Sequence, residues 1–335
     1  MPDQRRDATR KPSAARKIAW LGVVVLVAVV LYVGAWFFIA ARIENSLPDF
    51  FAQAQSEGIS PRCDNAEVRG FPFRLGLFCN GVAVEFEESA TTVSAGPVRS
   101  LAQVYNPRHI VSEIDGPLTI KGTAGLDLVL DWQLLHMSTV LSGNGVNRAS
   151  AEGVNISLSG DSPAFPVRLD ATAERVTAHA RANEGDLDVV ITADGFTSPL
   201  ALNARRINLE ATVENSASFL HGEEPDLRGK TIHLHGLRSE LDGGGAASLS
   251  GIVSIDRQGR ASGDLQLRLE QPAAVLQAIA VLRPELAEDI NRYGGLVTAL
   301  DTEPGDGSDT ITVPLTLRDG NASIGFLNLG TVPAL

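Results

Sequence analysis

The residues of this sequence best suited to chemistry are its histidines. His233 and His235 lie two positions apart, so on a β-strand both imidazoles point to the same face. A protein zinc site needs a third ligand, and the sequence places no carboxylate beside this pair. His109 has the chemistry of a general base, but no serine or cysteine stands in a recognisable nucleophile elbow. The sequence therefore predicts a solvated polar strand face, with no metal ligand and no catalytic residue.

The segments that look like anion or calcium loops lack the residues those ligands need. Gly243, Gly244 and Gly245 are not followed by the lysine and helix of a phosphate-binding loop. The acidic runs 85–88 and 223–226 do not repeat oxygen ligands at the regular spacing that binds Ca²⁺. We expect solvated loops here, and we predict no cofactor.

The two cysteines, Cys63 and Cys79, lie eight residues on either side of Phe71. A β-hairpin turning around Gly70-Phe71-Pro72 would place them opposite each other, so we predict a structural disulfide. Closing that loop is worth about 3 kcal/mol in the chain-entropy model. The C-x-x-C spacing of redox-active pairs is absent, which argues against a catalytic role.

The same turn carries two aromatic residues, Phe71 and Phe73, on either side of Pro72. Proline biases the residue before it towards an extended backbone, so both rings are expected on the same side of the chain. Two interpretations stay open. The rings pack into the core at the end of a sheet, or they form a lip that contacts a ligand.

The histidines, cysteines and phenylalanines above all follow an apolar segment near the N-terminus. Residues 18–41 form 24 positions without a charge, enough to span the ~30 Å hydrocarbon core of a bilayer. The tail before it, residues 1–17, carries six basic and two acidic residues. By the positive-inside rule this tail is cytoplasmic and residues 42–335 lie outside. A cleaved signal peptide is the alternative, but its apolar region is normally only about 7–15 residues long.

Beyond the apolar segment the dominant pattern is alternation with a period of two. Apolar and polar residues alternate in runs such as 126–132, 187–192, 207–214 and 265–270, separated by glycine, asparagine and aspartate. One face of each strand then meets an apolar interior and the other meets water, which is the antiparallel pattern. The fold class predicted is mainly β, within α+β: a transmembrane helix followed by a largely antiparallel sheet.

Helices are expected at only a few places outside the membrane. Residues 43–57 read as a helix that continues from the anchor and bends or restarts at Pro48. The segments 272–282 and 284–300 each begin with proline, which is favoured in the first helical turn. We expect these two helices to cover one end or one face of the sheet.

The charge balance excludes one class of partner. The chain has 335 residues, with 28 basic and 40 acidic side chains and a net charge of −12. A general nucleic-acid binder needs basic surface, so we predict no nucleic-acid partner. The part from Arg42 to Leu335 has a net charge of −16, with 22 basic and 38 acidic residues. Such a domain is not drawn electrostatically to anionic headgroups.

Five short motifs carry a resemblance to a known family. They are Gly70–Arg74 (GFPFR), Tyr105–Ile110 (YNPRHI), Asp115–Leu118 (DGPL), Pro314–Gly320 (PLTLRDG) and Leu327–Gly330 (LNLG). With the N-terminal anchor, their order and spacing resemble the bacterial family called domain of unknown function 2125, over nearly the whole chain. The stretch Phe326–Asn328 departs from the family, where a proline-containing turn is usual, and leaves that turn type open.

The family has no established activity. Its architecture is similar to that of AsmA-like envelope proteins, which are anchored at the N-terminus and built of curved β-sheet. That resemblance implies a curved sheet with an apolar groove for lipid. It also implies a single-pass protein of the bacterial inner membrane, with the bulk of the chain in the periplasm.

We therefore expect an apolar ligand, a lipid, to be bound or transferred by the periplasmic domain in envelope maintenance. The candidate lining residues, each of which fits ordinary core packing as well and is favoured there, are Phe71, Phe73, Leu126, Leu128, Leu130, Leu265, Leu267 and Leu269. The first alternative is a non-enzymatic scaffold with a fully packed core that engages another envelope protein. The second is an envelope hydrolase, which would need Asp115, His109 and a nucleophile within hydrogen-bond reach.

Overall fold

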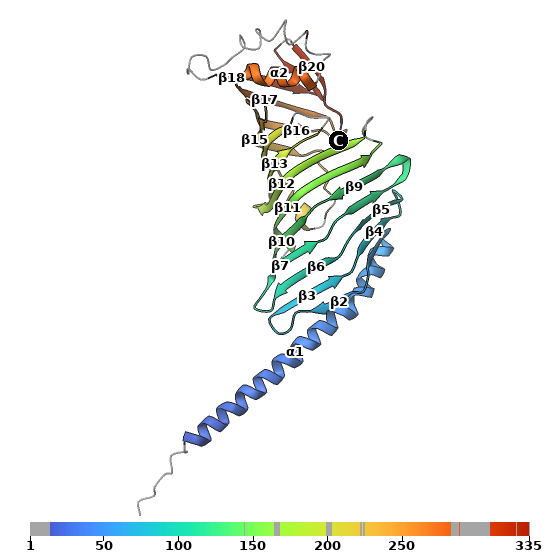
Figure 1. Ribbon diagram of the computed structural model, residues 1–335, viewed down its shortest axis with the longest axis vertical. Helices are drawn as coiled ribbons and strands as arrows, with labels where there is room; N and C mark the ends of the chain where they lie inside the picture. The colour runs from blue at the N-terminus through green and yellow to red at the C-terminus, as the bar shows by residue number, and fades with distance from the viewer. Residues whose placement is uncertain are drawn as a thin grey trace, which may run out of the picture.

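The protein is an antiparallel β-sheet preceded by one long helix (Figure 1). The computed structural model describes residues 14–143, 145–163, 168–198, 203–221, 223, 225–282, 288, 309–325 and 327–334. The predicted fold class, mainly antiparallel β with an N-terminal apolar helix, is confirmed. The predicted helix at 284–300 lies outside the described residues apart from residue 288.

Helix α1 (Ala14–Ser56) joins the predicted span and the predicted helix after it into one element. It runs without interruption through Pro48, where a bend or restart was expected. Its apolar part is long enough to cross a membrane, by length and composition. Nearly all of its apolar side chains between Ile18 and Ile39 are exposed, and Trp36 is the main exception.

The first half of the sheet consists of two arms, which we name arm A and arm B. Arm A pairs in the order β2 (Glu67–Arg69), β3 (Arg74–Cys79), β6 (Val98–Gln103), β7 (Asn106–Ile114) and β10 (Leu134–Ser142). Arm B pairs in the order β1 (Ile59–Cys63), β4 (Val82–Phe86), β5 (Thr91–Ala95), β8 (Leu118–Lys121) and β9 (Asp127–Asp131), with the short helix η1 (Thr123–Gly125) before β9.

The two arms meet at one long strand, β11 (Gly145–Asp161). Its first half pairs with β10 and its second half with β9, so the sheet forks along one edge of β11. Asn155 lies at the fork with a positive φ of 51°, and its side-chain amide donates to Gln133 Oε1 at 2.6 Å. Trp132 fills the fork, and its indole N–H donates to the Ile114 carbonyl at 2.8 Å.

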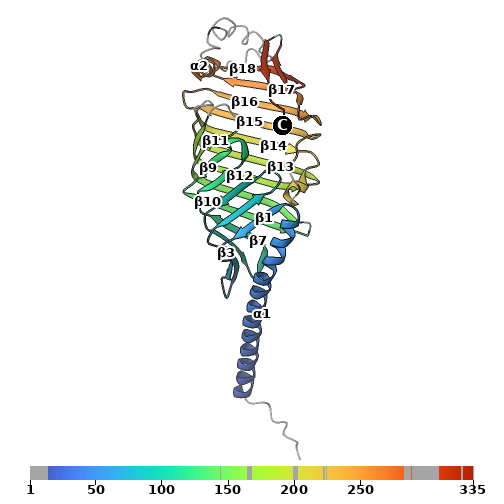
Figure 2. The same ribbon diagram turned by 90° about the vertical axis from the view of Figure 1, so that its right-hand side faces the viewer.

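The other edge of β11 begins the second half of the sheet, the trunk. Its strands pair in chain order: β12 (Leu169–Asn183), β13 (Asp186–Phe196), β14 (Ala204–Val213), β15 (Thr231–Leu241), β16 (Ala246–Ile255), β17 (Ala261–Glu270), β18 (Thr310–Arg318), β19 (Asn321–Ile324) and β20 (Leu327–Thr331). Figure 1 shows the strands of arm A face-on and β15 to β17 more nearly edge-on, and Figure 2 shows the trunk strands face-on, so the sheet turns along its length.

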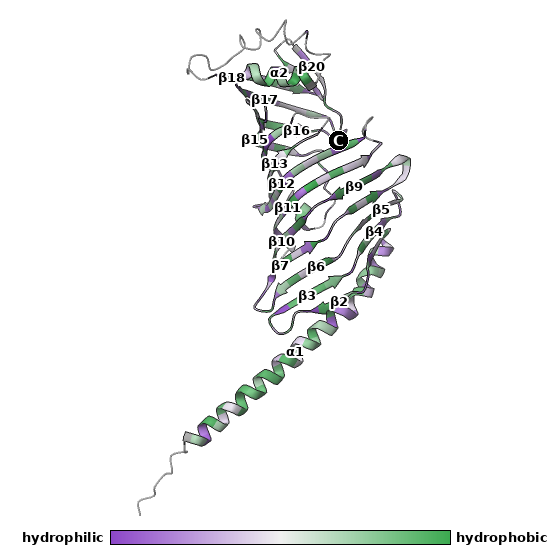
Figure 3. Cartoon of the chain, in the orientation of Figure 1, coloured by the Kyte–Doolittle hydropathy of each residue, from purple (hydrophilic) through white to green (hydrophobic). Residues whose placement is uncertain are grey.

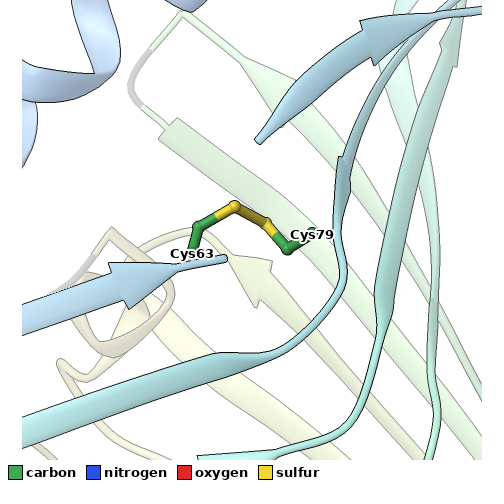
Figure 4. Close-up of a disulfide and its surroundings, with 2 residues drawn as sticks. All are labelled: Cys63 and Cys79. Carbon is green, nitrogen blue, oxygen red and sulfur yellow. A yellow bond between two sulfur atoms is a disulfide. The ribbon is translucent and has the colours of Figure 1, made fainter. Parts of the chain in front are cut away.

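The predicted disulfide between Cys63 and Cys79 is present (Figure 4). The predicted hairpin also forms, because β2 and β3 turn at residues 70–73, but it does not place the cysteines opposite each other. Cys63 ends β1 and pairs with Val82 of β4. The chain leaves β1 before it starts β2, so the disulfide ties arm B to arm A.

The buried core is small and lies at the far end of the trunk. Helix α2 (Pro272–Leu282), predicted as a covering helix, buries Val275 among Leu241, Leu269 and Ile311. A second short helix, η2 (Ala217–His221), contacts β11, β12 and β13. In the described part of the chain, most other strand residues lie outside any buried cluster.

Candidate functional site

The strand register aligns the apolar residues of the trunk into continuous rows. Each member of the first row is the direct cross-strand partner of the next, from β10 to β18. The row is Met137, Ala151, Ala178, Ile191, Leu209, Leu237, Leu249, Leu267 and Val313. Since side chains two positions apart share a face, the neighbouring rows extend this surface on the same side.

A second row runs through most of arm A and most of the trunk. It begins on β3 of arm A and ends on β18, and only Thr139 and Gly251 interrupt its apolar side chains. The row is Leu75, Ala102, Ile110, Thr139, Ala149, Ala180, Val189, Ala211, Leu234, Gly251, Leu265 and Leu315. We call the surface formed by these two rows the apolar face.

The opposite face of the trunk is polar and held by ion pairs. Arg175 pairs with Glu152, Arg181 with Asp188, and Arg206 with Asp194. Farther along, Arg238 reaches across β16 to donate two hydrogen bonds to Glu270, at 2.7 and 2.8 Å. The surface hollows found in the described residues lie mainly among such side chains, so they suit water and ions.

The pKa values of the Glu270 and Asp188 carboxyl groups are both shifted by these contacts. The hydrogen bonds from Arg238 hold the pKa of Glu270 below its ordinary value, although burial opposes this. For Asp188 burial is the largest influence and raises the pKa. Hydrogen bonds from Thr212, Arg181 and Asn183 together outweigh it, so the pKa of Asp188 is lowered. The polar face therefore favours charged, hydrated groups.

Within the described part of the chain, most side chains of the apolar face are half-buried. In the part of the chain that the structure describes, α2 covers its far end and η2 contacts the ends of three strands. Along the first row Leu237 is exposed, at 38%, Val313 is buried, and the other members are half-buried. Figure 3 shows the alternation of hydrophobic and hydrophilic residues along the strands.

The family model for an uncharacterised protein conserved in bacteria (DUF2125) matches residues 36–333. The chain belongs to the DUF2125 family. Comparisons with curated proteins and with solved structures find no match. The family match begins at Trp36 of α1, which packs against the β2–β3 hairpin.

The DUF2125 chain divides the predicted lining leucines between two environments. Leu128 and Leu130 lie on β9, where they pair with Ile120 and Leu118 of β8, and both are half-buried. Leu126 precedes β9 and is also half-buried. Leu267 belongs to the first row of the apolar face and packs against the α2 cluster. Leu265 and Leu269 are buried, and Leu269 is part of that cluster.

The two predicted phenylalanines lie at the tip of the β2–β3 hairpin of this DUF2125 protein. Phe71 is 46% exposed and Phe73 is 67% exposed, so the interpretation that they pack into the core is wrong. The hairpin extends beyond the sheet, and Phe71 packs instead against Trp36 and Phe37 of α1. Sequence reasoning missed this contact, because nothing in the local pattern links residue 71 to a helix 34 positions earlier.

The arrangement that the hydrolase alternative would need is only partly assembled in this DUF2125 protein. His109 Nε2 lies 2.8 Å from Ser138 Oγ, but Asp115 is held by two hydrogen bonds from Arg99. A similar pair lies on β11 and β12, where His179 Nδ1 is 2.9 Å from Ser150 Oγ. Among the described residues no carboxylate contacts either imidazole, so neither pair has the third group that orients a catalytic histidine.

The two histidines at 233 and 235 each have a separate partner. His233 Nε2 contacts Glu214, and His235 Nε2 lies 2.9 Å from Thr212 Oγ1. Among the residues that the structure describes, no three His, Cys, Asp or Glu side chains gather as metal ligands would. These side chains belong to the hydrogen-bonded polar face of β14 and β15.

Proposed function

We propose that this protein is anchored in the bacterial inner membrane by α1 and binds or transfers lipid along the apolar face of a periplasmic domain. The observation that carries the proposal is the continuity of the second row, from Leu75 on β3 to Leu315 on β18. Twelve strands at about 4.8 Å spacing make a row roughly 50 Å long. One leaflet of hydrocarbon is only about 15 Å thick, so the row exceeds the length of one acyl chain.

The resemblance to AsmA-like envelope proteins belongs to the same proposal. It rests on three features of this chain: the N-terminal apolar helix, the antiparallel sheet that turns along its length (Figures 1 and 2), and an apolar face that α2 and η2 cover only in part among the described residues. A monomeric soluble protein rarely leaves a contiguous apolar surface of this kind without a partner. Lipid is the partner whose chemistry matches a surface of aliphatic side chains in which Thr139 is the one polar member of the two rows.

Retention of α1, rather than its cleavage as a signal sequence, is supported by its contacts. Trp36 is 6% exposed, and its indole N–H donates to the Arg74 carbonyl at 3.0 Å. Glu44 accepts a hydrogen bond from the backbone N–H of Val68 at 2.9 Å. Cleavage near Ala41 would remove Trp36 from a packed site. The six basic residues of the tail favour a cytoplasmic N-terminus, and the disulfide suits an oxidising periplasm.

The proposed role is non-enzymatic and uses no cofactor. The serine–histidine pairs on the polar face lack an orienting carboxylate in the described part of the chain, and the apolar face supplies no general acid or base. Binding then depends on the burial of hydrocarbon, which is non-directional and proportional to area. Such a site selects lipids by their apolar bulk and leaves the headgroup in water.

The proposal is tested by native mass spectrometry of the full chain purified from membranes in mild detergent. The test variant is Leu209→Asp, which puts a charge in the middle of the apolar face. The matched control is Asn208→Asp, one residue away on the polar face, where the new carboxylate still accepts the Thr192 hydroxyl. We expect lipid bound to the wild type and to the control, and lost from Leu209→Asp, with all three chains folded by circular dichroism.

Two results would contradict lipid binding. One is a wild-type mass without lipid that stays unchanged after incubation with envelope lipids. The other is a Leu209→Asp protein that keeps its lipid as well as Asn208→Asp does. Either result would favour the alternative of an interaction scaffold, in which the apolar face is covered by another envelope protein.

A further inference from the structure

Two neighbouring hairpin turns form an exposed apolar surface at one end of arm A. We call it the aromatic tip, and it consists of Phe71 and Phe73 from the β2–β3 turn and Val104 and Tyr105 from the β6–β7 turn. Their exposures are 46%, 67%, 38% and 76%. The turns are joined directly, because the Val104 N–H donates to the Phe73 carbonyl at 3.0 Å. Four large apolar residues left together in water would be unfavourable without a partner.

The aromatic tip is packed against the side of α1. The ring of Phe71 lies 5.5 Å from Trp36 and 5.7 Å from Phe37, centroid to centroid. The hydroxyl of Tyr32 donates to the carbonyl of Pro72, at the centre of the turn. Figures 1 and 2 both show the ends of β2 and β3 beside α1, well before its C-terminal end.

These contacts set the depth of the tip if α1 crosses a bilayer. The uncharged run of α1 ends at Ala41, before Arg42. At 1.5 Å per residue, Trp36 lies about 7 Å and Tyr32 about 13 Å inside that end. The turn that contacts both residues therefore lies at the same depth, which reaches from the interface into the hydrocarbon of the outer leaflet.

The residues around the tip suit that position. Arg74 and Arg108 flank the two turns, and neither forms an ion pair with a described residue. Arginine side chains at this level extend towards lipid phosphates, and tyrosine is enriched at the membrane interface. The attraction between the aromatic tip and the bilayer is local and mainly apolar. The net charge of −16 from Arg42 to Leu335 therefore does not oppose it.

We propose that the aromatic tip inserts into the outer leaflet of the same bilayer that α1 spans. The inference rests on the proposed anchorage by α1, but not on lipid binding by the apolar face. Leu75, the first residue of the second row, is two positions after Phe73. Insertion of the tip therefore opens the start of the apolar face directly onto the hydrocarbon, with no aqueous gap between them.

The test measures the depth of single spin labels on the full chain in vesicles of phosphatidylethanolamine and phosphatidylglycerol. Phe73→Cys and Tyr105→Cys report on the two turns separately, so the loss of one contact does not remove both probes. Leu26→Cys, on the exposed side of α1, is the membrane control, and Val281→Cys, 76% exposed on α2, is the aqueous control. Both native cysteines are in the disulfide, so each introduced thiol is the only free one.

We expect the labels at 73 and 105 to collide more with oxygen and less with a water-soluble nickel chelate than the label at 281. If they match position 281 while position 26 reports hydrocarbon, insertion of the tip is wrong and a protein partner for the tip is favoured. If position 26 also reports water, the anchorage itself fails. Lipid binding by the apolar face is measured separately, so its failure would leave the depth result unchanged.

Discussion

Arg238 and Glu270 show how single residues hold the polar face together. They lie on β15 and β17, and the two hydrogen bonds between them cross the intervening strand β16. The pKa of Glu270 is lowered by this contact, so the folded protein keeps its carboxylate ionised to a lower pH than the unfolded chain does. This stabilisation is complete above the unfolded pKa of about 4.3 and is lost as pH falls through the lower folded value.

We predict that Glu270→Gln lowers the melting temperature at pH 7, and that the difference from wild type shrinks by pH 3. Thermal melts followed by circular dichroism at the two pH values check this. Glu174→Gln is the control, because Glu174 forms no ion pair with a described residue. An equal difference at both pH values would show that the effect of Glu270→Gln is not electrostatic.

At the scale of elements, the fork of the sheet depends on close approach between β9 and β11. Gly160 of β11 has a φ of +138°, and a Cβ there would overlap the carbonyl oxygen of Asp127. We predict that Gly160→Ala destabilises the protein by more than about 1 kcal/mol, since alanine fits neither the dihedral angle nor the space. Gly236→Ala, where no heavy atom lies within 4 Å of the new methyl group, should change stability much less. Urea unfolding compares them, and equal effects would contradict this account of the fork.

The disulfide acts at the same scale, since it joins arm A to arm B. It closes a loop between positions 16 residues apart, which is worth about 3 kcal/mol in the chain-entropy model. We predict that the double variant Cys63→Ser, Cys79→Ser loses stability of that order in urea unfolding. Reductant should destabilise the wild type and leave the double variant unaffected. If reductant affects both equally, the loss does not come from the cross-link.

At the scale of the whole molecule, the proposed function needs an apolar face that is continuous from arm A to the end of the trunk. The side chains of the apolar face are smallest on β11 and β12, where both rows consist of alanines such as Ala151 and Ala178. We predict that Ala178→Phe blocks movement of lipid past this point. A photoreactive residue at position 249 should capture lipid in the wild type but not in this variant. Thr177→Phe, on the polar face, is the control and should leave capture unchanged.

Much of the architecture follows from local patterns in the sequence. The uncharged run 18–41 predicts a helix that can span a membrane, because no other element satisfies its backbone in hydrocarbon. The alternation at 187–192 and 207–214 predicts strands with one apolar face, because side chains alternate across a pleated strand. Pro272 and the apolar residues after it predict α2, because proline is favoured in the first turn of a helix.

The tertiary structure decided which of these elements meet. Ile191 and Leu209 each read as apolar positions of a strand, but only the register places them side by side in a row. The hydrolase alternative needed Asp115 and His109 to be partners, yet Arg99 binds the carboxylate and Ser138 contacts the imidazole. The sequence left Phe71 either in the core or on a ligand-contacting lip, and the structure places it against α1. The periodicity of a sequence indicates which face of its own helix or strand a side chain occupies. Which side chains distant in the sequence it contacts depends on how the strands pair and how the sheet curves.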